Sequence, residues 1–360
     1  MIRIITAACW TITGLALIGL TLWFLTGSAF GLRGVGIFSG WSIGTGWETL
    51  TGPYEPVGVY NIDIGGIDSL NINWITGAVT VSPYDGLDIQ ITEFAQRALD
   101  DDESLQYDAS GSTLTIRYKA RTVTFGNSPQ KRLEVLVPRT LSAGLESLAI
   151  DSSSASIDIR EINASGIKID AVSGSITLSD IAAQTVDAST TSGSIIVSAA
   201  DADELKLRSV SGSIRASESH SAILDCSTTA GSINASGSFE QTAVKSVSGA
   251  ISLDNYASAS TVRVSSTSGA TDISGSYDSV DFSSVSGRVS VSSLIVPSSL
   301  RASTTSGKII ITVPDEGAIS VNHSSVSGKI SSEIPILTQS NDSQFRISTV
   351  SANVEIIAHS

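Results

Sequence analysis

One short phrase recurs at nearly even spacing through most of the chain, and it limits the fold more than any other feature. Its first full copy reads Val172-Ser173-Gly174-Ser175-Ile176, and later copies keep the Val or Thr, the glycine and usually the aliphatic residue. Measured from Ala155, which replaces glycine in the earliest copy, successive copies lie 18 to 21 residues apart. A period near 20 residues is typical of solenoids, whose repeats bury apolar faces only against one another. The turn glycines are Gly174, Gly193, Gly212, Gly231, Gly249, Gly269, Gly287, Gly307 and Gly328.

The residues around each glycine alternate between apolar and polar, as in half-buried strands. Positions −7, −5, +2 and +4, counted from the glycine, are mostly aliphatic, with Ser, Thr, Asp, Lys or Arg between them. Each unit is therefore predicted to be strand, tight turn, strand. The inward-facing positions are odd before the glycine and even after it. We therefore expect a left-handed residue at the glycine, with neighbouring hydroxyls holding the turn. Ala155 and Ala352 replace glycine in the first and last copies, where atypical repeats are expected.

Position −2 alternates between Val and Thr in every copy from Val172 to Val326. This alternation favours two units in each coil, about 38–40 residues, with Val units stacked on Val units. The alternative is a coil of one 19-residue unit, with Val above Thr in a single row. At ~4.8 Å per coil, residues 59–360 would measure roughly 36–40 Å in the first case and roughly 70 Å in the second.

The N-terminal region predicts a membrane anchor. Residues 4–25 contain no charged side chain, and 22 residues at about 1.5 Å each can span a hydrocarbon core of ~30 Å. A cleaved signal peptide is the alternative, but the apolar stretch is longer than such segments usually have. We therefore expect a single-pass anchor (1–25) in the plasma membrane, a Gly- and aromatic-rich linker (26–58), and the repeats on the extracytoplasmic side.

Residues 59–145 are expected to form irregular N-terminal β coils before the regular repeats of residues 146–360. Gly77 occupies a turn of the same kind, four periods before Ala155, so the intervening stretch is predicted to keep the rhythm of the solenoid. An acidic run, Ala98–Ser104, lacks the glycine and glutamate spacing of a calcium loop and is expected to be a solvated loop. Six basic residues follow it and either neutralise that loop or contact a phosphate-bearing polymer. They are Arg117, Lys119, Arg121, Lys131, Arg132 and Arg139.

Taken together, these motifs resemble a known bacterial family. The anchor, the Leu-Glu-Val-Leu-Val-Pro segment (Leu133–Pro138) and the Val-Ser-Gly and Thr-Ser-Gly turns followed by Ile are similar to the "putative adhesin" domain of unknown function. The resemblance covers about residues 57–357. It implies a right-handed β-helix on the cell envelope, like the heads of autotransporter adhesins, and brings no catalytic residues. This chain departs from the family pattern in often placing Ser after the turn glycine.

The remaining residues predict no catalytic chemistry. A formal charge of −14 disfavours nucleic acid as a partner, because phosphate binding needs an excess of Lys and Arg. Four aspartates are expected to be spread along the solenoid and not to converge on a catalytic site: Asp158, Asp170, Asp187 and Asp225. His323 falls on an inward position, and no hydrolase elbow or metalloprotease motif accompanies it or the other histidines, His220 and His359. Cys9 and Cys226 are expected to lie on opposite sides of the membrane, so no disulfide is predicted.

The sequence therefore predicts a non-enzymatic surface protein without catalytic, cofactor or metal residues. Its partners would be the membrane, through residues 4–25, and a surface polymer or a protein, while the oligomeric state stays open. The alternatives are a structural or signalling envelope protein that binds a membrane partner and, more remotely, a polysaccharide-cleaving β-helix, which would need paired carboxylates on one face.

Overall fold

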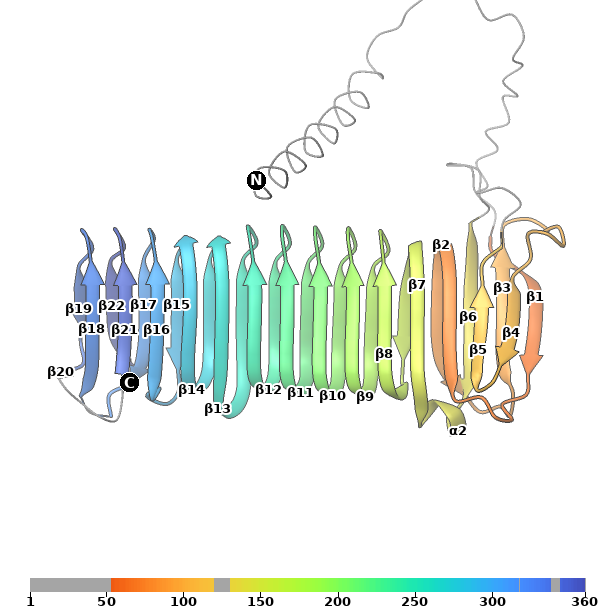
Figure 1. The fold of residues 1–360 in the computed structure, drawn as a ribbon, viewed down its shortest axis with the longest axis horizontal. Helices are drawn as coiled ribbons and strands as arrows, with labels where there is room; N and C mark the ends of the chain where they lie inside the picture. The colour runs from red at the N-terminus through yellow and green to blue at the C-terminus, as the bar shows by residue number, and fades with distance from the viewer. Residues whose placement is uncertain (1–52, 120–129, 317, 338–343, 360) are drawn as a thin grey trace, which may run out of the picture. The chain divides into compact units, whose positions relative to one another are not determined.

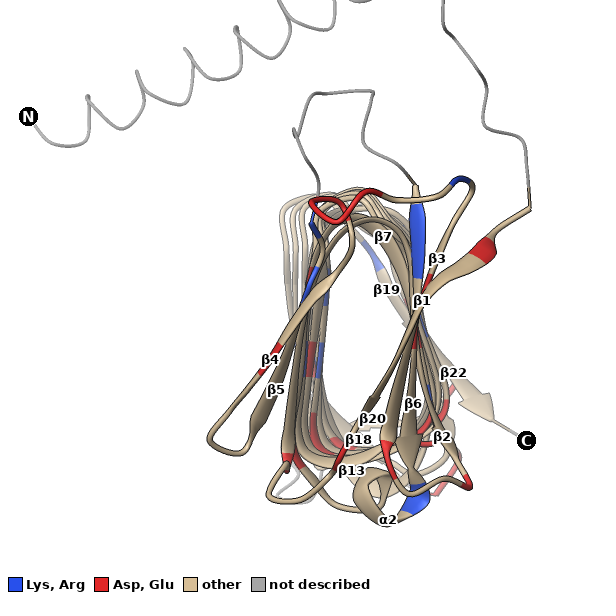
Figure 2. Cartoon of the chain, turned by 90° about the vertical axis from the view of Figure 1, so that its right-hand side faces the viewer, with Lys and Arg blue, Asp and Glu red and all other residues tan. Residues whose placement is uncertain are grey.

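A computed structural model describes residues 53–119, 130–316, 318–337 and 344–359 of the chain. These residues form a stack of β coils whose strands lie side by side along one axis (Figure 1). Viewed along that axis, each coil is a flattened loop with two long sides (Figure 2). The expected all-β solenoid is confirmed, and its handedness remains a prediction.

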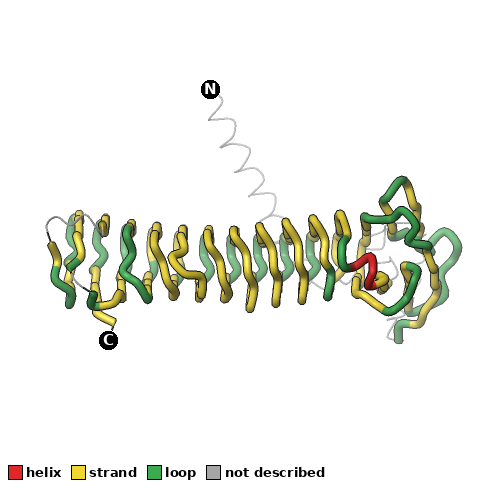
Figure 3. The backbone as a smooth tube through the Cα atoms, turned by 90° about the horizontal axis from the view of Figure 1, so that it is seen from below, coloured by secondary structure: helices red, strands yellow, loops and turns green. Residues whose placement is uncertain are grey.

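The strands vary in length because some bend around a corner and contribute to both sides of a coil. The N-terminal strands are β1 (Glu55–Ile62), β2 (Ser69–Tyr84), β3 (Ile89–Ala95), β4 (Gln106–Ser110), β5 (Thr113–Arg117) and β6 (Lys131–Pro138), followed by the short helix α2 (Arg139–Ser142). The regular coils contain β7 (Leu145–Arg160), β8 (Asn163–Ala171), β9 (Ile176–Thr190), β10 (Ile195–Ser209), β11 (Ile214–Thr228), β12 (Ile233–Ser246), β13 (Ile251–Ser268) and β14 (Thr271–Ser286). The C-terminal strands are β15 (Val289–Ser293), β16 (Ser299–Thr304), β17 (Ile309–Pro314), β18 (Ile319–Ser325), β19 (Ile330–Ser332), β20 (Ile336–Leu337), β21 (Gln344–Thr349) and β22 (Val354–His359). Figure 3 shows the even succession of coils and the less regular N-terminal end that contains α2.

Each regular coil contains one repeat unit, so the predicted pair of units per coil is wrong. Ile195 pairs with Ile176 on one side and with Ile214 on the other, in parallel register. The side chains at position −2 are exposed at the turn, Val172 by 55% and Val210 by 47%. Val and Thr stack there in one row without filling the core, so their alternation does not require two kinds of position. Nothing in the structure explains why they alternate.

A second corner, which was not predicted from the sequence, closes each coil within about 19 residues. Asp180 and Ala199 occupy this corner in successive coils with φ of 53° and 51°, in the left-handed region. Residues without a glycine's freedom rarely adopt this conformation, which reverses the direction in which the next side chain points. The other non-glycine residues with positive φ are Glu161, Glu218 and Ala259.

The interior of the coils is a continuous aliphatic core, as the alternation predicted. Ile176, Leu178, Val186 and Ala188 of a single coil are all at most 1% exposed. Burying a large aliphatic side chain contributes roughly 1.5–3 kcal/mol, which a coil gains only when neighbours cover it.

The turns are held by a buried hydroxyl at position −3. Ser209 Oγ accepts a hydrogen bond from the amide of Gly212 (2.8 Å) and donates one to the carbonyl of Gly193 in the preceding coil (3.1 Å). Thr190 and Thr228 make the same pair of bonds in the neighbouring coils. The expectation that hydroxyls stabilise the turn is therefore confirmed, and these bonds also link successive coils.

The turn glycines are required mainly for space, which corrects the prediction that left-handed backbone explains all of them. Gly77, Gly269, Gly287 and Gly307 have φ between 98° and 126°. The other turn glycines are not among the left-handed residues. A Cβ on Gly212 would instead lie 1.7 Å from the carbonyl oxygen of Gly193 in the preceding coil. Similar contacts of 1.7–1.9 Å occur at Gly174, Gly193, Gly231, Gly249 and Gly328.

At the N-terminal end, strand order in space differs from order in the sequence. β2 pairs directly with β7, placing Gly77 beside Ala155, so the stretch between them does not continue the solenoid rhythm as predicted. That stretch forms β5 and β6, which pair with the opposite edge of β2, and β3 and β4, which pair with them in antiparallel register. β1, which precedes β2 in the sequence, pairs with β3 and helps to close the end. β1 begins at Glu55, inside the segment expected to be linker.

A similar rearrangement occurs at the C-terminal end. β21 lies between β16 and β18, and β22 lies between β17 and β19, all in parallel register. The coil of residues 344–359 therefore fills a space between two coils that precede it in the sequence. Ala352 consequently belongs to an internal coil, whereas Gly328 belongs to the outermost one, contrary to the expectation that Ala352 marks the end.

Within the described ranges, no helix is long and apolar enough to cross a membrane. The expected anchor, residues 4–25, and nearly all of the expected linker lie outside those ranges.

Candidate binding groove

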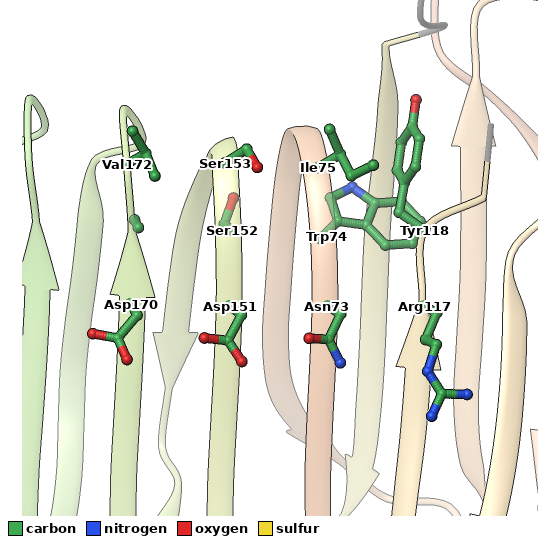
Figure 4. Close-up of a pocket in the computed structure, with 11 residues that line it drawn as sticks. Asn73, Trp74, Ile75, Arg117, Tyr118, Asp151, Ser152, Ser153, Asp170 and Val172 are labelled. Carbon is green, nitrogen blue, oxygen red and sulfur yellow. The ribbon is translucent and has the colours of Figure 1, made fainter. Parts of the chain in front are cut away.

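A hollow lies near the N-terminal end, on the long side of the coils that precedes the turn. We call this outer surface the pre-turn face. It is formed by the residues at even positions before the turn, such as −4 and −6, counted back from the turn glycine. The hollow, here the N-terminal pocket, has a volume of about 460 Å³ and is lined by residues of β2, β5, β7 and β8 and the positions that follow them. Two parallel rows of side chains bound it (Figure 4).

The first row is polar and crosses four neighbouring strands. Strand register places Arg117 beside Asn73, Asn73 beside Asp151, and Asp151 beside Asp170. Asp170 accepts a hydrogen bond from Ser189 and contacts the ammonium group of Lys168 at 3.1 Å, so its charge is balanced locally. The Ser189 hydroxyl, followed by Lys168, lowers the pKa of the Asp170 carboxyl. Arg117 and Asp151 are exposed, and neither makes an ion pair among the described residues.

The second row lies nearer the turn and includes Ile75, Ser153 and Val172 (Figure 4). Between the two rows the chain directs Trp74 and Ser152 inward. Trp74 is buried and packs edge-on against Tyr118, with ring centroids 5.1 Å apart. The indole nitrogen of Trp74 is buried, and no described residue offers it a hydrogen-bond partner.

Beneath these rings lies a buried ionic cluster. The ammonium group of Lys131 contacts Glu93 at 2.9 Å and donates to the carbonyls of Lys119 (2.9 Å) and Glu103. It also lies 4.3 Å from the centroid of the Tyr118 ring. All three protons of the ammonium group are thus engaged within the protein, so Lys131 stabilises the N-terminal end and is not available to a ligand.

Burial and charge shift the pKa values of this cluster in opposite directions. Burial lowers the pKa of Lys131, although hydrogen bonding to Glu93 opposes the change. Burial, with nearby Glu93 and Glu103, raises the pKa of Tyr118 to about 12. The bidentate hydrogen bonds from Arg97, 2.7 and 2.8 Å long, lower the pKa of Glu103 to about 2.

A second hollow adjoins the N-terminal pocket at Ala171, and we call the two hollows together the groove. The second hollow, of about 390 Å³, lies between the same two rows in the next coils, lined by residues around Ser189, Arg208 and Ser227 on one side and Thr191 and Val210 on the other. The groove therefore extends across seven strands in spatial order: β5, β2, β7, β8, β9, β10 and β11.

Charges of opposite sign alternate on the pre-turn face beside this groove. Lys168, Asp187, Lys206 and Asp225 occupy equivalent positions in successive coils. Arg208 contacts Asp187 at 2.8 Å and Asp225 at 4.0 Å. Acidic and basic residues accordingly gather along the side of the loop on which β5 lies (Figure 2). The paired charges neutralise one another. Because these ion pairs are exposed, each contributes little to stability.

Three of the four predicted aspartates lie on the pre-turn face, and the fourth lies on the opposite side of the coil. Asp187 and Asp225 share Arg208, Asp170 borders the N-terminal pocket, and Asp158 pairs with Arg160 on the opposite side of the coil. Among the described residues, no group of three or more His, Cys, Asp or Glu side chains could hold a metal ion.

The predicted basic residues separate into different roles. Lys131 is buried in the ionic cluster, Lys119 reaches the carbonyl of Asp101 at 3.4 Å, and Arg139 pairs with Asp85 and Glu161. Arg132 lies 3.8 Å from Glu134. Contacts to the acidic run thus support the neutralising role for Lys119 and Lys131. Arg121 lies outside the described residues.

His323 lies on an inward register position of the outermost coil, beside Ile347. It borders a hollow of about 400 Å³ that also includes Ile336, Leu337 and Arg346, and its Nε2 is buried without a partner. Cys226 is buried, and burial raises the pKa of its thiol, so it is unreactive.

The N-terminal pocket was not predicted from the sequence. Arg117 and Asp151 are 34 residues apart in the sequence. They lie on either side of Asn73 because β2 pairs with both β5 and β7. One sequence feature pointed to part of this arrangement: Asn73 and Asp151 occupy the same position relative to Gly77 and Ala155.

Comparison with solved structures finds remote similarities. A "putative adhesin" of Parabacteroides distasonis covers 85% of this chain and 98% of its own at 12% identity and a TM-score of 0.39. A "putative lipid binding protein" of the same organism covers 84% and 97% at 17% identity and a TM-score of 0.35. A "putative cell adhesion protein" of Clostridium sporogenes covers 85% and 100% at 9% identity and a TM-score of 0.22.

No protein of curated function matches the chain. The family model called Toastrack DUF4097 matches it twice, over residues 67–242 and 220–357. These matches extend over most of the solenoid and confirm the family resemblance that the turn motifs indicated. The chain belongs to the Toastrack DUF4097 family.

Proposed function

We propose that the chain is a non-catalytic binding module of the bacterial cell envelope. Residues 4–25 anchor it in the plasma membrane, and the solenoid faces the extracytoplasmic side. The observation that carries the proposal is the groove on the pre-turn face, which crosses seven strands and presents exposed polar side chains on a rigid support. A groove of this kind suits an elongated ligand better than a reaction centre, because its charged groups are distributed along an axis and do not converge.

The experiment compares cells lacking the chain with cells that produce the full-length protein, using arrays of surface peptides, glycans and matrix proteins. We expect the producing cells to be retained on at least one class of ligand. A second strain carrying Asp151→Lys and Val172→Glu in the groove should lose that retention while displaying the same amount of protein. Equal retention of all three strains would contradict the proposal.

The alternative is a structural or signalling protein that binds a partner in the membrane. It is favoured by the apolar side chains exposed at the C-terminal end, among them Ile336 (43%) and Leu337 (47%). Photo-crosslinking from position 337 in intact cells separates the two functions. A single membrane protein captured there, together with unchanged retention on every array, would favour the alternative.

A further inference from the structure

The N-terminal pocket presents two opposite charges that make no ion pair among the described residues. The guanidinium group of Arg117 and the carboxylate of Asp151 are exposed, and among the described residues neither takes part in an ion pair. Neither is paired in the way that Asp187 is paired with Arg208, and Asp151 interacts with Lys168 only as a more distant charge. Two opposite charges without an ion-pair partner on the rim of one hollow indicate a ligand that itself carries both signs.

The spacing of the strands that carry these two charges restricts the ligand. Arg117 and Asp151 lie on either side of Asn73 on adjacent strands. Two strand spacings separate their Cα atoms by about 9.6 Å. An extended peptide covers at most about 3.3–3.6 Å per residue, so the amino and carboxyl termini of a tripeptide lie about 10 Å apart. The two distances agree.

Asn73 lies between the two charges and matches the middle of such a ligand. Its Nδ2 contacts the Oδ1 of Asn71 at 3.3 Å, which leaves its own Oδ1 and one N–H for a ligand. A primary amide presents a donor and an acceptor side by side, which complements the N–H and C=O groups of a peptide. Ile75 and Val172 on the opposite wall supply apolar contact for the peptide side chains.

We propose that the N-terminal pocket binds a short extended peptide with free termini, lying along the solenoid axis. Arg117 pairs with its carboxylate, Asn73 with its peptide groups, and Asp151 with its ammonium group. This inference rests on the proposed binding function and names the ligand class of one part of the groove.

The test measures binding of trialanine to the full-length protein by isothermal titration calorimetry. The other probes are N-acetyl-trialanine amide, which lacks both charges, and a neutral chitotriose. The variants are Arg117→Gln and Asp151→Asn, and the control is Arg301→Gln, an exposed arginine near the other end of the solenoid. The altered side chains are exposed, so we expect all three variants to fold like the wild type, as monitored by circular dichroism.

We expect trialanine to bind the wild type and the Arg301→Gln control equally. Each pocket variant should weaken binding about fivefold, the factor that one exposed charge pair can contribute. The blocked peptide should bind more weakly than trialanine by the product of the two factors. Equal affinity for blocked and free peptide, or unchanged affinity in both pocket variants, would overturn the assignment.

The outcome also separates this inference from the proposed function. Binding of chitotriose but not trialanine would overturn the peptide assignment and leave the binding module intact, since the groove would then hold a glycan. Absence of binding to all three probes, with cells still retained on a surface array, would likewise overturn only the peptide assignment. If no probe binds and the cells are retained on no surface array, the proposed function is overturned as well.

Discussion

Replacing Gly212 by Ala tests why glycine recurs at the turns. Its added Cβ would lie 1.7 Å from the carbonyl oxygen of Gly193, which is 1.3 Å closer than the 3.0 Å that real Cβ atoms keep. The contact is with backbone, so no side chain can move aside. The turn must therefore rise from the preceding coil by more than 1 Å.

Such a displacement breaks the hydrogen bonds that hold this turn to the coil before it. They run from Ser211 N to Thr191 O (2.9 Å), from Val210 N to Thr190 O (3.2 Å) and from Ser209 Oγ to Gly193 O (3.1 Å). At about 1 kcal/mol each, their loss amounts to about 3 kcal/mol, and overpacking adds about 1–3 kcal/mol. We therefore expect Gly212→Ala to lower the free energy of unfolding by about 5 kcal/mol.

Two glycines with other environments provide matched controls. Gly166 has ordinary φ, and its added Cβ would meet only Thr185 Oγ1 at 3.6 Å, so Gly166→Ala should change stability by less than about 1 kcal/mol. Gly111 has φ of +62° with open space around it, so Gly111→Ala should cost only the left-handed strain of about 1–2 kcal/mol.

The assay is urea unfolding followed by circular dichroism, with hydrogen exchange to locate the damage. Exchange should accelerate at Val210 and Ser211 before it does in distant coils, because each coil contacts only its neighbours. If Gly212→Ala matches Gly166→Ala in stability, the steric explanation of the turn glycines is refuted.

Three further substitutions test the buried polar groups. Lys131→Met leaves Glu93 buried without its cation and should destabilise the protein by about 3–5 kcal/mol in urea unfolding, with partial recovery in Lys131→Met/Glu93→Gln. No recovery would show that the two side chains act independently. Asn255 bonds to the N–H and C=O of Phe239 and to the N–H of Ala257, so Asn255→Leu should cost about 3 kcal/mol, whereas Asn234→Leu on the outer surface should cost little; equal effects would contradict the role of these bonds. Because the pKa of Glu103 is lowered to about 2, its contribution is present above pH 4.5 and lost as pH falls toward 2, so the urea midpoint should fall further in wild type than in Glu103→Gln. Parallel pH profiles would refute the assigned pKa.

The core could be predicted from the sequence because its signal is local. Inward residues such as Ile176 and Leu178 follow the period of a strand and recur with each turn, so their burial required no knowledge of the coil. The size of the coil could not be predicted in the same way. Its second corner is occupied by Asp180, Ala199 and Glu218, which share no side-chain chemistry, because the backbone conformation and not the side chain is repeated there.

The ends and the groove depend on pairings between distant segments. β2 pairs with β7 across the residues that form the N-terminal end, and the alternation within each strand is the same whichever neighbour it has. Arg117 and Asp151 therefore carried no sign of their proximity. Residues at the pocket were predicted only as members of separate sets, Arg117 with the basic residues and Asp170 with the spread aspartates.

The position of residues 344–359 between two earlier coils has a consequence for how the protein is made. During synthesis, β18 and β19 emerge before the strands that join them to β16 and β17. Until β21 and β22 follow, the coil that contains β18 and β19 has no neighbour on its inner side, and the end of the solenoid stays open. A chain that folds as it is synthesised thus completes this end last, once its final strands are available.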